Sequence, residues 1–138
     1  MDGLSLGAGV RATARIVATD IGRSLQPIPG SGAVKDVSFV QRERDGQNVK
    51  LTIKRLKPAT GAIETIAPVM DGVAEADTAW SPDGTLLTVA RGVLYAWKPG
   101  ESTSWTEVTS LQRLSLSNVS RLAVSPKGDF IALVGAPR

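Results

Sequence analysis

The sequence predicts an all-β protein, and three observations point to this fold class. In some segments of the 138 residues apolar and polar positions alternate, as in a half-buried strand. Other apolar runs are short and nearly continuous, which suits a strand buried on both faces. No long stretch has apolar residues at helical spacing, and 14 glycines and 8 prolines separate the short segments. Such a pattern is typical of sandwiches, barrels and propellers.

The predicted strands follow one another along the chain. Val49–Lys54 alternates apolar and polar residues, whereas Leu86–Ala90 and Phe130–Val134 are almost entirely apolar. One short helical turn is compatible with residues 110–117. The predicted strands are 13–19, 25–28, 37–44, 49–56, 63–66, 86–90, 93–97, 105–108, 119–124 and 130–134.

An internal repeat narrows the choice of architecture. Ala79–Val89 aligns with Ala123–Leu133 at an offset of 44 residues, and both segments run from an apolar residue through Ser-Pro-charged-Gly into an apolar strand. A degenerate third copy spans residues 37–66, with Asp45-Gly46 as its turn. A four-stranded unit of 40–45 residues is the period of a β-propeller blade.

The repeated tetrapeptide has the chemistry of a tight turn. Proline presets φ, aspartate bonds locally, and glycine takes the positive φ of a bulged hairpin. The serine hydroxyl can accept a turn N–H. We therefore assign a structural turn role to Ser81, Pro82, Asp83, Gly84, Ser125, Pro126, Lys127 and Gly128.

These two motifs resemble the WD40-like repeats of the TolB-type family of bacterial β-propellers. The resemblance covers about residues 35–138. The first unit lacks Ser-Pro-Asp-Gly, the last has Lys127 where Asp is usual, and no preceding α/β domain is visible. The resemblance implies a propeller fold and a scaffold role, with no catalytic residues to transfer. It also implies a periplasmic protein if a leader has been removed, and otherwise we expect a cytoplasmic one.

The length predicts about three blades, whereas closed propellers typically have four to eight. We expect a flexible arm at 1–12 and a propeller unit at 13–138. Within this unit, 35–70 and 71–118 form blades, and 13–34 with 119–138 form the two halves of a closure blade. The leading hypothesis is a homodimer that closes a six-bladed ring. The alternative is a fragment of a longer propeller.

Composition excludes several chemistries. With no cysteine and no histidine, the chain has no Ser-His-Asp triad, disulfide or Cys-ligated zinc. The net charge of +3 comes from scattered basic residues, and only six aromatic residues are present, so we expect no nucleic-acid partner. No apolar stretch reaches the length of a membrane span. We expect no enzyme activity, cofactor or metal.

Other candidate residues have both a functional and a structural interpretation. Asp71–Asp77 is acidic, but it lacks the alternating ligands of a calcium loop, which favours a solvated loop over a weak cation site. Trp80 and Trp97 are expected in the core, whereas Trp105 could be exposed. We name Trp105, Arg42 and Arg44 as candidate partner contacts. The basic residues Lys50, Lys54, Arg55 and Lys57 are expected to form a solvated, edge-protecting face, with an acidic partner as the alternative.

The function predicted from these patterns is a non-enzymatic scaffold that binds a protein or peptide. We expect the loops after Asp45, Asp83 and Lys127 to lie together on one face, since they occupy equivalent points of the repeat. The alternative is half of a ligand- or glycan-binding or hydrolytic propeller, with its site at the channel mouth.

Overall fold

The computed structural model describes residues 4–5, 11–12, 25–30, 34–70, 77–114 and 116–137. These residues form twelve strands and one 3-10 turn at Gln112–Leu114, with no α-helix among them, so the predicted all-β class is confirmed. No helix in this part of the chain is long and apolar enough to cross a membrane.

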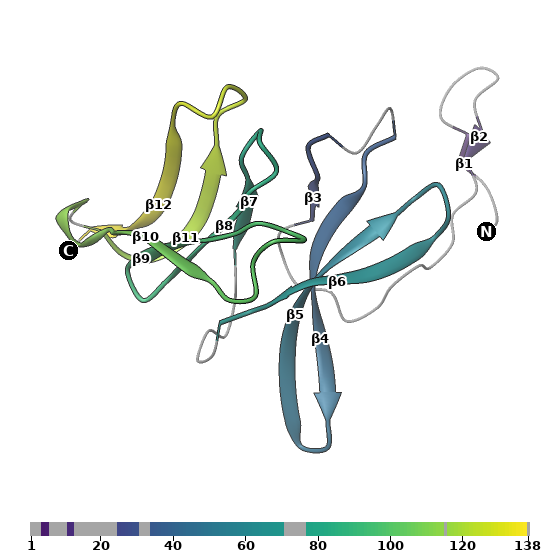
Figure 1. Ribbon diagram of the computed structural model, residues 1–138, viewed down its shortest axis with the longest axis horizontal. Coiled ribbons are helices and arrows are strands. Elements are labelled where there is room, and N and C mark those ends of the chain that lie inside the picture. The colour runs from purple at the N-terminus through teal and green to yellow at the C-terminus, as the bar shows by residue number, and fades with distance from the viewer. Residues whose placement is uncertain are drawn as a thin grey trace.

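The first large sheet has four antiparallel strands in chain order (Figure 1). They are β3 (Gln26–Pro27), β4 (Val37–Asp45), β5 (Asn48–Lys57) and β6 (Ala62–Pro68). The register is continuous from Val37 opposite Leu56 to Asp45 opposite Asn48. This long β4–β5 hairpin is the most extended feature of the sheet.

A second four-stranded sheet repeats this order. Its strands are β7 (Thr78–Trp80), β8 (Leu86–Ala90), β9 (Val93–Trp97) and β10 (Thr106–Ser110). Apolar and β-branched residues dominate β7 to β9, as expected for strands covered on both faces. The predicted apolar strands at 86–90 and 93–97 lie at the centre of this sheet.

Two further sheets have two strands each. β11 (Leu116–Val124) pairs antiparallel with β12 (Ile131–Pro137), and near the N-terminus β1 (Leu4–Ser5) pairs with β2 (Arg11–Ala12). The second of these pairs lies within the segment that we expected to be a flexible arm. Residues 13–19, predicted as a strand, lie outside the described residues.

The predicted position of strand 25–28 is wrong. We assigned it to the outer half of a closure blade, but Gln26 and Pro27 pair with Ser38 and Val37, which makes β3 the first strand of the first sheet. The chain reverses between these strands, and the Ile28 N–H donates to the Asp36 carbonyl at 2.8 Å. Since this loop has no Ser-Pro-Asp-Gly motif, the sequence pattern did not mark it as a turn.

The prediction that the Asp45-Gly46 turn is equivalent to the Ser81–Gly84 turn is also wrong. It joins β4 to β5, whereas the Ser81–Gly84 turn joins β7 to β8, which are the first and second strands of their sheet. Because successive turns of an antiparallel sheet lie at opposite ends, the loop after Asp45 cannot share an edge with the loop after Asp83. In Figure 1 the β4–β5 hairpin points away from the other two turns.

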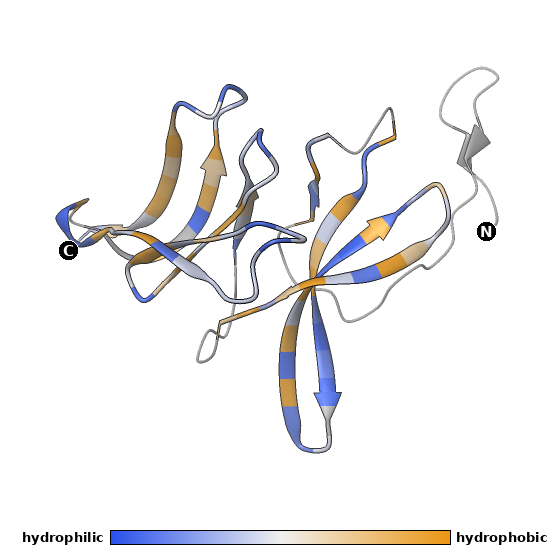
Figure 2. Cartoon of the chain, in the orientation of Figure 1, coloured by the Kyte–Doolittle hydropathy of each residue, from blue (hydrophilic) through white to orange (hydrophobic). Residues whose placement is uncertain are grey.

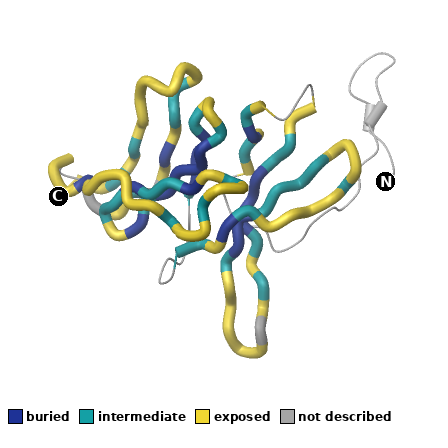
Figure 3. The backbone as a smooth tube through the Cα atoms, in the orientation of Figure 1, coloured by how far each residue is buried: buried dark blue, intermediate teal, exposed yellow. Residues whose placement is uncertain are grey.

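The hydrophobic core has two layers, one on each face of the second sheet. The first layer contains Ile53 and Val40 of the first sheet with Trp80, Leu86 and Trp97 of the second. The second layer joins the second sheet to β11–β12, and its buried members are Ala79, Leu87, Leu94, Leu111 and Leu122. Figure 2 shows the alternation of apolar and polar residues along β5, and Figure 3 shows that burial concentrates between the sheets.

Candidate interaction surfaces

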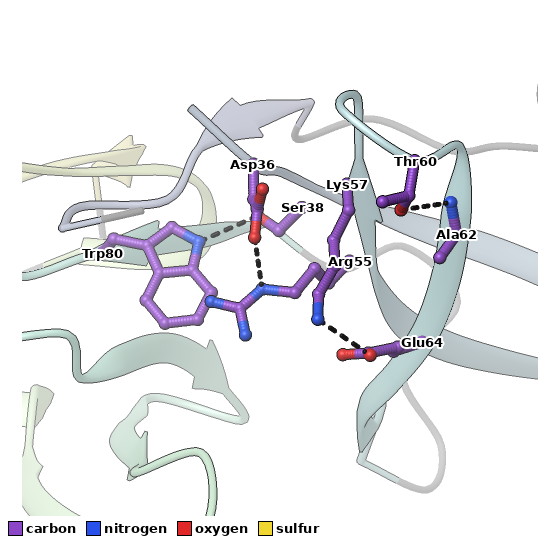
Figure 4. A network of polar contacts seen from close by, with 8 residues as sticks. All are labelled: Asp36, Ser38, Arg55, Lys57, Thr60, Ala62, Glu64 and Trp80. Carbon is purple, nitrogen blue, oxygen red and sulfur yellow. Dashed lines mark hydrogen bonds and ion pairs between the residues drawn. The ribbon is translucent and has the colours of Figure 1, made fainter. Parts of the chain in front are cut away.

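Polar contacts fasten the first sheet to the second. The indole Nε1–H of Trp80 donates to the Ser38 Oγ at 2.8 Å, and both residues are buried (Figure 4). The side-chain amide of Gln26 also donates to the Thr78 carbonyl. A buried indole N–H needs such an acceptor, so this pair fixes how β7 lies against β4.

Trp105 belongs to the same junction. Its ring packs edge-to-face against Trp97, with centroids 5.4 Å apart, and its Nε1–H donates to the Pro68 carbonyl at 2.8 Å. Trp105 is half-buried and contacts the first core layer. Trp105 is therefore not fully exposed, because the end of β6 occupies its N–H and its ring lies against Trp97, and its role as a partner contact stays a prediction.

A carboxylate fastens the second sheet to β11. The Asp77 carboxylate accepts the N–H of Leu122 at 2.7 Å, while the Asp77 carbonyl accepts the Thr88 hydroxyl at 2.9 Å. Leu122 is buried in the second core layer. Asp77 therefore bridges three strands, β7, β8 and β11. The rest of the acidic stretch, residues 71–76, lies outside the described residues, and the described residues contain no metal-binding cluster.

The Ser81 side chain is engaged inside its turn. Its hydroxyl donates to the Asp83 carboxylate and its Oγ accepts the Thr85 N–H at 3.3 Å. Asp83 also accepts the Thr85 N–H, at 3.1 Å. The Ser81 hydrogen bond, followed by the bonds from Thr85, lowers the pKa of Asp83 below its usual value. These bonds stabilise the turn.

The turn that begins at Ser125 makes the corresponding hydrogen bonds but contains one more residue than the turn that begins at Ser81. Phe130 donates its N–H to the Ser125 Oγ at 3.0 Å, and Gly128 donates to the Ser125 carbonyl at 2.9 Å, as Gly84 does to Ser81 at 3.0 Å. Thr85 closes the first turn but Phe130 closes the second, so the 44-residue alignment slips by one position after Gly128. Ile131, rather than Phe130, is the structural equivalent of Leu86.

These two turns lie against each other. A Cβ built on Gly128 would stand 3.2 Å from the Cδ of Pro82. This proximity agrees with the expected grouping of the loops after Asp83 and Lys127 on one face. Pro82, Asp83, Lys127 and Asp129 are all exposed there.

The basic residues of β5 are largely paired with acids. Lys54 forms an ion pair with Glu43, Arg55 with Asp36 at 3.3 Å, and Lys57 with Glu64 at 3.0 Å. Figure 4 shows the last two pairs. The Lys54 ammonium, through its hydrogen bond, is the main cause of a lowered pKa at Glu43. The expectation of an edge-protecting face is wrong, because β5 pairs with β4 on one side and with β6 on the other.

Two exposed surfaces are candidates among the described residues. The first lies on the outer face of β12, where Val134 is 58% exposed, and at the residue before the strand, Phe130, which is 75% exposed; Ile131, 42% exposed, lies on the face toward the second sheet. The second is the distal part of the β4–β5 hairpin, where Arg42 and Arg44 are exposed beside Val49. The two arginines were predicted as partner contacts from the sequence, but the β12 surface was not, because an apolar strand in a repeat is expected to be covered.

No family description, curated protein or solved structure matches this chain.

Proposed function

We propose that this chain is a set of β-propeller blades, resembling the TolB-type WD40-like repeats, that serves as a non-enzymatic protein-binding scaffold. In this proposal a second copy completes the ring into six blades. Two features of the described residues support it, namely the repeated connectivity of the sheets and the exposed outer face of the last one.

The connectivity supports a series of equivalent blades. In each of three consecutive sheets, a backbone N–H near the end of the first strand donates to a carbonyl just before the second strand. The distances are 2.8 Å from Ile28 to Asp36, 2.9 Å from Ser81 to Thr85 and 2.9 Å from Ser125 to Phe130. Four-stranded antiparallel sheets in chain order, packed face against face, are the arrangement of propeller blades.

The observation that best supports the proposal is the burial of the face that each sheet presents to the next sheet. Ser38 and Val40 of the first sheet are buried toward the second, and Leu87 of the second packs with Val89 toward β11–β12. Strand alternation puts Ala132 and Val134 of β12 at the equivalent positions, because Leu133 between them packs on the second core layer. Ala132 is exposed and the Val134 side chain is 58% exposed. Because side chains on this face are exposed where the equivalent ones of the other sheets are covered, we assign the face to a neighbouring blade.

A charge placed beside this face tests the proposal. Phe130→Asp should convert a dimer into a monomer while leaving the circular dichroism spectrum unchanged, because a buried carboxylate without a partner costs far more than an exposed one. Val108→Asp is the matched control, since Val108 is 53% exposed on β10. Light scattering that finds the same mass for both variants would reject the assignment of this face.

A further inference from the structure

The β4–β5 hairpin extends beyond the strands on either side of it. β3 pairs with β4 only at Val37 and Ser38, and the pairing of β6 with β5 ends at Thr52. We call residues 42–51 the arm. In Figure 1 the arm projects away from the other sheets, and in Figure 3 it is mostly exposed.

The positive charge of the chain is concentrated in this hairpin. Residues 37–57 contain six basic and two acidic residues, a net charge of +4, whereas the other 117 residues contain ten basic and eleven acidic residues, a net charge of −1. The ion pairs of Lys54, Arg55 and Lys57 lie nearer the body of the sheet. The arm itself, residues 42–51, contains three basic and two acidic residues, a net charge of +1, so its distinction is where these charges lie and not their sum.

The two faces of the arm differ in character. Arg42 lies opposite Leu51 and Arg44 opposite Val49, so these four side chains share one face. The opposite face contains Glu43, which is paired with Lys54 and accepts the Thr52 hydroxyl at 3.4 Å. The arginine face has no carboxylate among its four residues.

The arginine face is also continuous with the hydrophobic core. Leu51 is partly buried and packs against the first core layer, whereas Val49, two residues further along the arm, is 56% exposed. The face thus runs from a covered apolar residue to an exposed one, with two guanidinium groups alongside. Arginine beside apolar surface is a combination enriched in protein interfaces.

We propose that the arginine face of the arm binds an extended acidic segment of a partner protein. Carboxylates of that segment pair with Arg42 and Arg44, and an apolar side chain between them covers Val49, because side chains on one face of an extended strand recur every second residue. A nucleic acid fits less well. The one aromatic residue of the hairpin, Phe39, is buried and offers no stacking surface.

This inference names the partner chemistry of the proposed scaffold, but it depends on the arm alone and not on ring closure. The probe is a fluorescein-labelled peptide of alternating glutamate and valine, and its binding is followed by fluorescence anisotropy at low and high salt. Arg42→Glu with Arg44→Glu should weaken binding at least about tenfold. Arg113→Glu with Lys127→Glu is the matched control, because it changes net charge equally at exposed sites elsewhere.

The outcomes separate the alternatives. Peptide binding that depends on the arm and weakens with salt supports the proposal. Arg42→Gln with Arg44→Gln serves as a second variant if charge reversal impairs folding, and it should weaken peptide binding by a smaller factor than the two glutamates do. No peptide binding, an equal loss in the control, or tighter arm-dependent binding of single-stranded DNA would overturn it. Light scattering on the same samples keeps the two proposals apart, since a dimer that does not bind the peptide rejects the arm site alone.

Discussion

The second sheet and the β11–β12 sheet contain nearly the same hairpin in different surroundings. In both, a Ser-Pro-x-Gly turn joins the two strands and makes corresponding backbone bonds, with one more residue in the second turn. Yet Leu86 is fully buried, whereas its structural equivalent Ile131 is 42% exposed. The comparison teaches that the repeat determines strand and turn, while the burial of an equivalent side chain depends on how fully the neighbouring sheet covers it.

The largest expected effect is a difference in stability loss between alanine at Leu86 and alanine at Ile131. Leu86→Ala should lower the free energy of unfolding by about 3 kcal/mol, because it leaves a cavity between two packed sheets. Ile131→Ala should cost less than about half as much in the monomer, since solvent already reaches this side chain. Urea denaturation of dilute protein measures both values, and equal losses would remove the distinction between the two hairpins.

The next largest effect tests the hydrogen bond that links the second sheet to β11. Asp77→Ala removes the acceptor of the buried Leu122 N–H and should cost about 2 kcal/mol. Asp77→Asn keeps an acceptor oxygen and should cost clearly less. Hydrogen exchange should show faster exchange in β11 and β12 than in β3–β6, whereas uniform acceleration would mean that Asp77 does not hold β11 specifically.

A smaller effect probes the contact between the repeated turns. Gly128 and Gly100 both have positive φ, at 77° and 84°, so alanine at either position should cost about 1 kcal/mol. Only Gly128→Ala also brings a Cβ to within 3.2 Å of Pro82, whereas nothing lies within 4 Å of the Cβ position at Gly100. The melting temperature of Gly128→Ala should therefore be lower than that of Gly100→Ala, and the reverse order would argue against close packing of the two turns.

The smallest effect concerns pH. The folded-state pKa of Asp83 is lowered, so its stabilising contribution is present above the ordinary aspartate pKa and is lost as pH falls through the folded value. Asp83→Asn should therefore flatten the decline in melting temperature below about pH 4. Lys127 occupies the equivalent place in the second turn, and Lys127→Asn serves as the control that should leave the decline unchanged.

Local chemistry made the turns and most strands predictable from the sequence. Ser81–Gly84 and Ser125–Gly128 fold as their residue types indicate, and the apolar runs at 86–90 and 93–97 form the central strands of the second sheet. The place of Asp45-Gly46 in the repeat was not predictable in this way, because Asp-Gly favours tight hairpins between any two strands.

The contacts between sheets were harder to predict. The bonds from Trp80 to Ser38 and from Leu122 to Asp77 join residues more than 40 positions apart. They depend on how whole sheets pack, and no local pattern indicates them. The same reason explains Trp105, whose polar flanks suggested exposure although its ring packs on Trp97.

The central claim is that a second copy covers the outer face of β11–β12. Light scattering of the unmodified chain at micromolar concentration tests it most directly. The proposal predicts a stable particle of twice the 14.5 kDa chain mass. A particle of 14.5 kDa that persists as the concentration rises would contradict it.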